Sequence, residues 1–182
     1  IRVFEIQRGR PITLAGFAKW ALSKELLRRK EFSDGKIEYG GPLFLYAPFD
    51  YTRGLDYTPN KTALDRQSEL LTRYFTALKK SLNRVSRDRW NNPLEYGITK
   101  TTGVNASLLV LNRLLESYPR LELDLDSYLR PLGKLSFKNP WIRRFGGGWE
   151  GFKGLANRMI WVLNRSSRVK LKRYERKRKG GG

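Results

Sequence analysis

The clearest structural signal in the chain is the stretch from Lys61 to Arg87, KTALDRQSELLTRYFTALKKSLNRVSR. A helix brings every third or fourth residue to the same side, and here that side is apolar. Its members are Leu64, Leu71, Tyr74, Phe75, Leu78, Leu82 and Val85. The spacing predicts an amphipathic helix over residues 61–87, with Thr62 as its N-cap.

Apolar residues at helical spacing continue on both sides of this stretch. They predict helices over residues 13–30, from Thr101 to Pro119, over a short segment capped at Asp124 or Asp126, and after the glycines at 146–148. For Thr101 and Thr102, a helix cap is the simplest role. Residues 1–7 predict a short strand, and residues 31–60, rich in Gly, Pro, Asp and Tyr, predict a long irregular connection with room for a hairpin.

The predicted elements indicate a mainly α fold, in which a compact helical domain with small β elements occupies residues 1–164. Residues 165–182 predict a basic C-terminal arm that is extended, or becomes helical on binding. Its large apolar residues Val169, Leu171 and Tyr174 form no helical stripe. We therefore expect the arm to contribute little to the core.

Composition excludes much chemistry. The 182 residues contain no His and no Cys, so thiol nucleophiles, His-based triads and zinc sites built from Cys and His are impossible within this chain. No apolar run is long enough to span a membrane. We expect no metal, no cofactor, no membrane partner and no catalytic residue, and a cytoplasmic or nucleoid-associated location.

The charge is strongly positive. There are 37 Lys and Arg against 17 Asp and Glu, a formal net charge of +20. The arm holds nine of these bases and one acid, so it contributes +8 and leaves +12 on residues 1–164. A charge of this size over the whole chain predicts a polyanionic partner, and nucleic acid is the natural one.

The predicted helix over residues 61–87 also aligns cations. Arg66, Arg73, Lys80, Arg84 and Arg87 fall in a narrow wedge almost opposite the apolar side. The line is about 30 Å long at roughly 1.5 Å per residue. A solvated helix surface, partly neutralised by Glu69, is the alternative interpretation.

Other bases complete the predicted nucleic-acid interface. A glycine-rich turn, GGGWEGFKG at 146–154, favours an anion at a helix start, although close helix packing also explains its glycines. Basic residues at this turn and in the arm are Arg143, Arg144, Lys153, Arg165, Arg168, Lys170, Lys172, Arg173, Arg176, Lys177, Arg178 and Lys179. A weaker hypothesis is a metal-dependent nuclease that uses the alternating acids Glu122, Asp124 and Asp126.

Four phrases in order resemble one family: GRPITL at 9–14, Tyr74-Phe75, WNNP at 90–93, and TKTTGVNA at 99–106. This part of the chain, roughly residues 8–118 with a weaker echo at 146–154, resembles the carboxyl-terminal part of DGQHR-domain proteins. These are relatives of the ParB-like group that includes a DNA-phosphorothioation regulator. The family's signature, Asp-Gly-Gln-His-Arg, is absent because the chain has no His, so no catalytic residue carries over. The resemblance implies DNA association in modification or defence systems.

Together these features predict a non-enzymatic nucleic-acid-binding domain that contacts phosphates and favours DNA over RNA. A structural RNA-binding protein of a ribonucleoprotein particle is the main alternative. The chain begins at Ile1 and ends in three glycines. We therefore expect a missing amino-terminal region or partner protein.

Overall fold

A computed structural model describes residues 18–54, 56–86, 89–166 and 170–175. It shows a mainly helical fold with one small antiparallel sheet, which confirms the predicted fold class. In chain order the elements are η2 (Ala18–Leu27, a π-helix), β1 (Lys30–Glu31), β2 (Ile37–Glu38), α2 (Pro42–Tyr46), α3 (Thr58–Asn83), α4 (Thr101–Ser117), α5 (Leu125–Leu129), η3 (Arg130–Lys134, a 3₁₀-helix), α6 (Asn139–Arg143) and α7 (Gly148–Ser166). The strand predicted over residues 1–7 lies outside the described residues.

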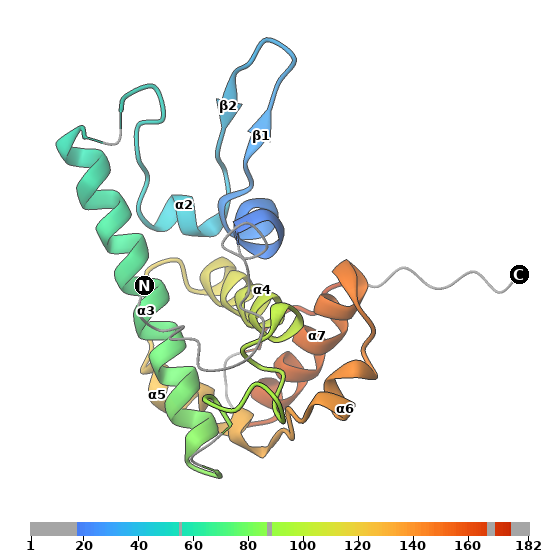
Figure 1. Cartoon of the computed structure of the whole chain (residues 1–182). Helices are drawn as coiled ribbons and strands as arrows, with labels where there is room; N and C mark the ends of the chain where they lie inside the picture. Colours follow the sequence, from blue (N-terminus) through green and yellow to red (C-terminus); the bar gives the residue numbers. More distant parts are fainter. Residues whose placement is uncertain (1–17, 55, 87–88, 167–169, 176–182) are drawn as a thin grey trace, which may run out of the picture.

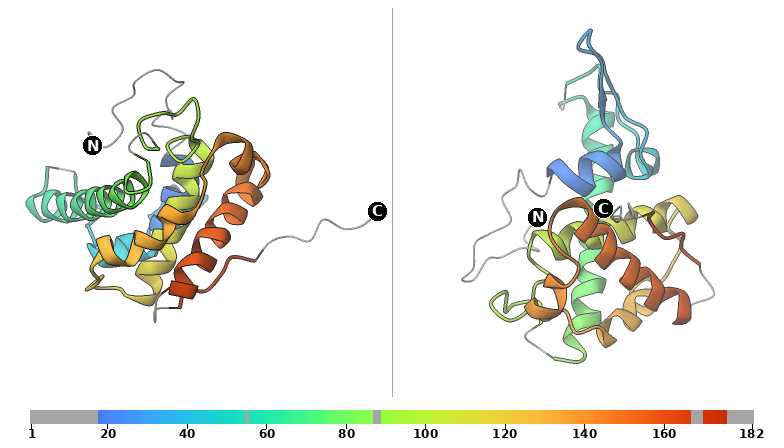
Figure 2. Two further views of the ribbon diagram at one scale, coloured as in Figure 1. Left: turned by 90° about the horizontal axis from the view of Figure 1, so that it is seen from below. Right: turned by 90° about the vertical axis from the view of Figure 1, so that its right-hand side faces the viewer.

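Helix α4 forms the centre of the molecule. It is buried from Gly103 to Asn112 and again at Leu114 and Leu115, and the buried residues include the polar Asn105, Ser107 and Asn112. Helix α3 lies on one side of α4 and α7 on the other (Figures 1 and 2). Buried polar contacts join the layers: the Tyr74 hydroxyl of α3 donates to the Ser107 carbonyl of α4 (2.8 Å).

The sequence pattern of α3 is largely confirmed, with shifted ends. Leu71, Phe75, Leu78 and Leu82 are buried as predicted. The helix begins at Thr58, with Pro59 in its first turn, where a missing amide costs no hydrogen bond. Thr62 is therefore not the N-cap. Its hydroxyl donates to the Thr58 carbonyl (3.1 Å) inside the helix.

Two further differences concern the apolar side of α3. Val85 was expected to be buried, but it follows the end of the helix and is 58% exposed. Leu70, Ala77 and Ser81 are buried instead, because α5 and η3 pack against that flank. The buried surface of α3 therefore extends closer to the predicted basic residues than the sequence indicated.

Residues 28–54 form a lobe beside α3 (Figure 1). The predicted hairpin is present as β1 and β2, with Lys30 opposite Glu38, and it projects away from the helices (Figure 1). The following loop is tied to α3 by Asn60, whose amide donates to the Asp50 carbonyl (2.8 Å) and whose Oδ1 accepts from the Asp50 amide (2.7 Å).

The ends of the other helices agree only in part with the sequence prediction. In the described part of the predicted helix over 13–30, the π-helix η2 ends at Leu27, three residues before the predicted end, because Arg28 adopts a positive φ and Lys30 belongs to β1. The Ala21 amide of η2 donates to Asn105 Oδ1 of α4 (3.0 Å). Helix α4 has Lys100 as N-cap with no side-chain cap bond, so capping does not explain the threonines. Gly103 is required for close packing, because a Cβ there would lie 2.3 Å from the Ile98 carbonyl oxygen. Of the two predicted caps of α5, Asp124 and Asp126, the structure has Asp124.

The C-terminal segment departs most from its prediction. Helix α7 crosses the expected boundary at residue 164 and ends at Ser166. Residues 170–175 then run as an extended segment beside α7, with Leu171 and Tyr174 both buried in the core. The expectation that the arm contributes little to the core is wrong for this part. Its apolar residues do not need a helical stripe, because an extended segment buries them.

Candidate nucleic-acid interface

The basic residues of α3 lie on its solvent side. Arg66, Arg73, Lys80 and Arg84 are all exposed, and the predicted fifth member, Arg87, lies outside the described residues. From Arg66 to Arg84 the line is about 27 Å long at 1.5 Å per residue. We call these four residues the α3 stripe. Its length matches about eight base-pair steps of a nucleic-acid duplex.

The charges of the α3 stripe are only partly neutralised. Lys80 forms an ion pair with Asp126 of α5 (2.7 Å), and both side chains are substantially exposed. Within the described part of the chain, Arg73 and Arg84 form no ion pair, and Glu69 pairs with neither Arg66 nor Arg73. Arg66 instead lies over the ring of Tyr46, 6.0 Å from its centroid. Three arginines of the stripe therefore keep their charge available to a partner.

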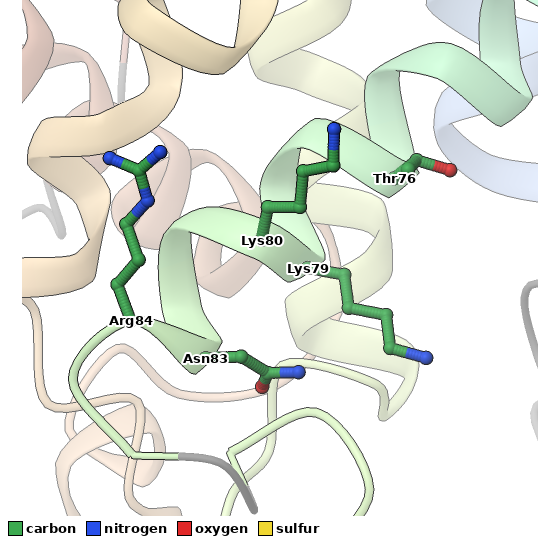
Figure 3. A pocket seen from close by; sticks show the side chains of 5 residues that line it. All are labelled: Thr76, Lys79, Lys80, Asn83 and Arg84. Carbon is green, nitrogen blue, oxygen red and sulfur yellow. The ribbon is translucent and has the colours of Figure 1, made fainter.

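A shallow hollow lies at the C-terminal end of the α3 stripe. It has a volume of about 400 Å³ and is lined by Thr76, Lys79, Lys80, Asn83 and Arg84. Figure 3 shows Lys80 and Arg84 extending in one direction from the helix, and Lys79 and Asn83 in another. Three cations and two neutral hydrogen-bonding groups around one hollow suit a phosphate group. The sequence interpretation missed Lys79, which lies outside the narrow wedge but at i−1 from Lys80.

The glycine-rich turn is a poorer anion site than predicted. Arg143 and Arg144 are exposed at the end of α6, which lies away from α3 (Figure 1). The ammonium of Lys153, which was predicted as a phosphate contact, is engaged within the fold: it pairs with Glu150 (3.3 Å) and donates to the Glu175 carbonyl (3.1 Å). Gly151 serves close packing, since a Cβ there would lie 2.3 Å from the Gly146 carbonyl oxygen.

Residues 170–175 are held on α7 by two asparagines. The Asn157 side chain accepts from the Tyr174 amide (2.7 Å) and donates to the Tyr174 carbonyl (2.8 Å). Asn164, one heptad later, makes the same pair of bonds with Leu171 (2.8 and 2.9 Å). Both carboxamides thus satisfy the backbone of an extended segment, as a neighbouring β-strand would.

Tyr174 anchors this segment in the core. Its hydroxyl donates to the Leu109 carbonyl (2.8 Å) and accepts from the Asn112 amide (2.9 Å). The Arg113 guanidinium lies over its ring, 3.9 Å from the centroid, and burial raises the pKa of the hydroxyl. Between the two anchors, Lys172 and Arg173 are exposed.

Of the other basic residues predicted in the arm, two lie in the described part of the chain and five lie outside it. Arg165 is exposed at the end of α7, and Lys170 is exposed while its ammonium donates to the Asn164 carbonyl. Arg168, Arg176, Lys177, Arg178 and Lys179 lie outside the described residues. The structure therefore brings Arg165, Lys172 and Arg173 to α7, apart from the α3 stripe.

The acidic residues do not form a metal site within the described residues. Asp124 is occupied as the cap of α5, where bonds from Ser127 hold the pKa of its carboxyl below the usual range. Asp126 is paired with Lys80. The nuclease hypothesis thus has no ligand cluster in the described part of the fold.

Comparison of the chain with protein-family models, with curated proteins and with solved structures found no match. Among the described helices, none is both long and apolar enough to cross a membrane.

Proposed function

We propose that this chain is a nucleic-acid-binding domain that contacts the phosphate backbone through the α3 stripe, with DNA as the favoured partner. The observation that carries the proposal is the α3 stripe of four exposed cations, three of which, the arginines, have no acidic partner within the described residues. Counterions released from phosphates by such a row give affinity without sequence preference. The preference for DNA comes from the family resemblance.

The hollow at Lys79, Lys80 and Arg84 supports the same proposal. Lys80 and Arg84, one helical turn apart, extend from the helix in the same direction and can give a phosphate charge-assisted hydrogen bonds together. The Lys80–Asp126 pair does not oppose this role, because an exposed ion pair is worth about 0–1 kcal/mol and exchanges readily for a phosphate. An RNA helix offers phosphates too, so structured RNA remains the competing partner in any test.

The test compares two variants that lose the same charge. One carries Arg66→Gln, Arg73→Gln and Arg84→Gln. The control carries Lys36→Gln, Lys61→Gln and Lys138→Gln, which are exposed bases already paired with acids. Binding of a fluorescent 20-base-pair duplex is measured by anisotropy at 0.1 M salt, with structured RNA as competitor.

We expect the stripe variant to bind at least tenfold more weakly than the wild type, since each lost phosphate contact removes about 0.9 of a counterion. The dissociation constant of the control variant should stay within about threefold of the wild-type value, because the control substitutions reduce only the overall positive electrostatic potential of the molecule. Equal losses in both variants would show that binding depends on net charge and not on the α3 stripe.

A further inference from the structure

Helix α7 carries a second cationic surface. Trp161 is half-buried on its outer side, and two arginines stack on its ring, Arg158 at 4.2 Å and Arg165 at 4.8 Å from the centroid. Both arginines are exposed, and within the described residues neither forms an ion pair. The indole fixes both guanidinium groups in place, which lowers the entropy cost of using them to bind an anion.

The extended segment enlarges this surface. The clamp made by Asn157 and Asn164 holds residues 171–174 along α7, beside the side that carries Trp161. Lys172 and Arg173 then face solvent between the buried anchors Leu171 and Tyr174. We call Arg158, Arg165, Lys172 and Arg173 the α7 patch. One acid, Glu175, accompanies it on the segment.

The α7 patch and the α3 stripe lie on opposite sides of α4. Helix α7 packs its buried side, including Leu155, Met159 and Leu163, against the core that contains α4, so Arg158 and Arg165 point away from it. Figures 1 and 2 show α3 and α7 on the two sides of the central helix. A straight duplex lying along one surface does not reach the other.

We infer that the α7 patch is a second, weaker phosphate-binding site, and that the protein bridges two nucleic-acid segments. This inference rests on the proposed function of the α3 stripe. The patch is weaker because Arg158 and Arg165 are only about 10 Å apart along the helix axis, which limits the number of phosphates they reach. Asn157 and Asn164 are its positioning residues, because they hold the segment that supplies Lys172 and Arg173.

A capture assay tests the inference. A duplex is immobilised and saturated with the full chain, and the retention of a second, labelled duplex is measured. The patch variant carries Arg158→Gln, Arg165→Gln and Arg173→Gln. The paired-base variant Lys36→Gln, Lys61→Gln, Lys138→Gln again matches the charge loss, and thermal melting checks the folding of both.

We expect the wild type and the paired-base variant to capture the second duplex. The patch variant should bind the first duplex within about threefold of the wild type but retain at least tenfold less of the second. Capture at the wild-type level by the patch variant would overturn the inference, and so would a wild type that saturates the first duplex without capturing another. Failure of the wild type to bind the first duplex would instead contradict the proposed function itself.

Discussion

Tyr174 shows how a single residue in a basic run becomes part of the core. Its hydroxyl bonds to the Leu109 carbonyl and the Asn112 amide in a buried environment. Tyr174→Phe leaves the Asn112 amide without this acceptor, so we expect a loss of about 1–3 kcal/mol in the free energy of unfolding. Urea denaturation measures it. Tyr51→Phe, which removes a hydroxyl from a 43% exposed ring, should change stability little; an equal effect of both changes would contradict the anchoring role.

Asp124 links the cap of α5 to pH. Its pKa is lowered by the bonds from Ser127 and Asp126, so the ionised form stabilises the native state. That stabilisation is present above the unfolded-state pKa of about 3.9 and is lost as the pH falls through the lower folded-state value. Asp124→Asn keeps a good cap. We therefore expect the variant to melt like the wild type at pH 7 and to lose less stability between pH 4 and pH 2; parallel curves for both proteins would contradict this.

At the scale of the element, one side of α3 contributes to stability because it is buried in the core, and the opposite, exposed side carries the proposed phosphate contacts. Leu78→Ala should cost about 2–5 kcal/mol through lost burial and a cavity, whereas Leu94→Ala, at a 76% exposed site, should cost little. Replacing Arg73, Lys80 and Arg84 with Gln should leave the melting temperature within a few degrees, because exposed charges add little stability. A large drop in melting temperature for the triple variant would show that these charges are structural.

In the C-terminal segment, residues that contribute to binding and residues that contribute to stability are expected to follow one another along the chain. Deleting residues 176–182 removes four bases beyond the Tyr174 anchor, so it should reduce the salt dependence of binding without changing the melting temperature. Deleting residues 170–182 also removes Leu171 and Tyr174 from the core and should destabilise the fold. If both deletions melt alike, the segment does not contribute to the core.

The elements that the sequence predicted are those with local patterns. Helix α3 and helix α7 follow from apolar spacing, and the cap of α5 follows from Asp124, because each signal lies within a few residues. The docking of residues 170–175 depends on Asn157 and Asn164. Their spacing of seven residues, which places them on one side of α7, can be read from the sequence, but the sequence does not indicate which segment they bind. The π-helix η2 is hydrogen-bonded to Asn105 of α4 through its Ala21 amide, and these two residues are 84 positions apart in the sequence. Such contacts become apparent only once the helices are packed.

The candidate site was predictable to a similar extent. The helical wheel identified the α3 stripe, because exposure follows from periodicity. It did not identify the ion pair of Lys80 with Asp126, the ion pair of Lys153 with Glu150, or the stacking of Arg158 and Arg165 on Trp161. Each of these depends on rotamers and on neighbouring elements. A count of charges therefore overestimates the cations available at the glycine-rich turn, because it includes Lys153, and on α7 it includes Arg165 but misses Arg158.

At the scale of the whole molecule, the proposed binding depends on electrostatic contacts with phosphates. The most direct measurement is the dissociation constant of the unmodified chain for two duplexes of unrelated sequence, determined from 50 to 200 mM salt. With three or more phosphate contacts on α3, log K should fall with log salt at a slope of about −3 or steeper, and equally for both duplexes. No binding at 50 mM salt, or an affinity that does not depend on salt, would contradict the account.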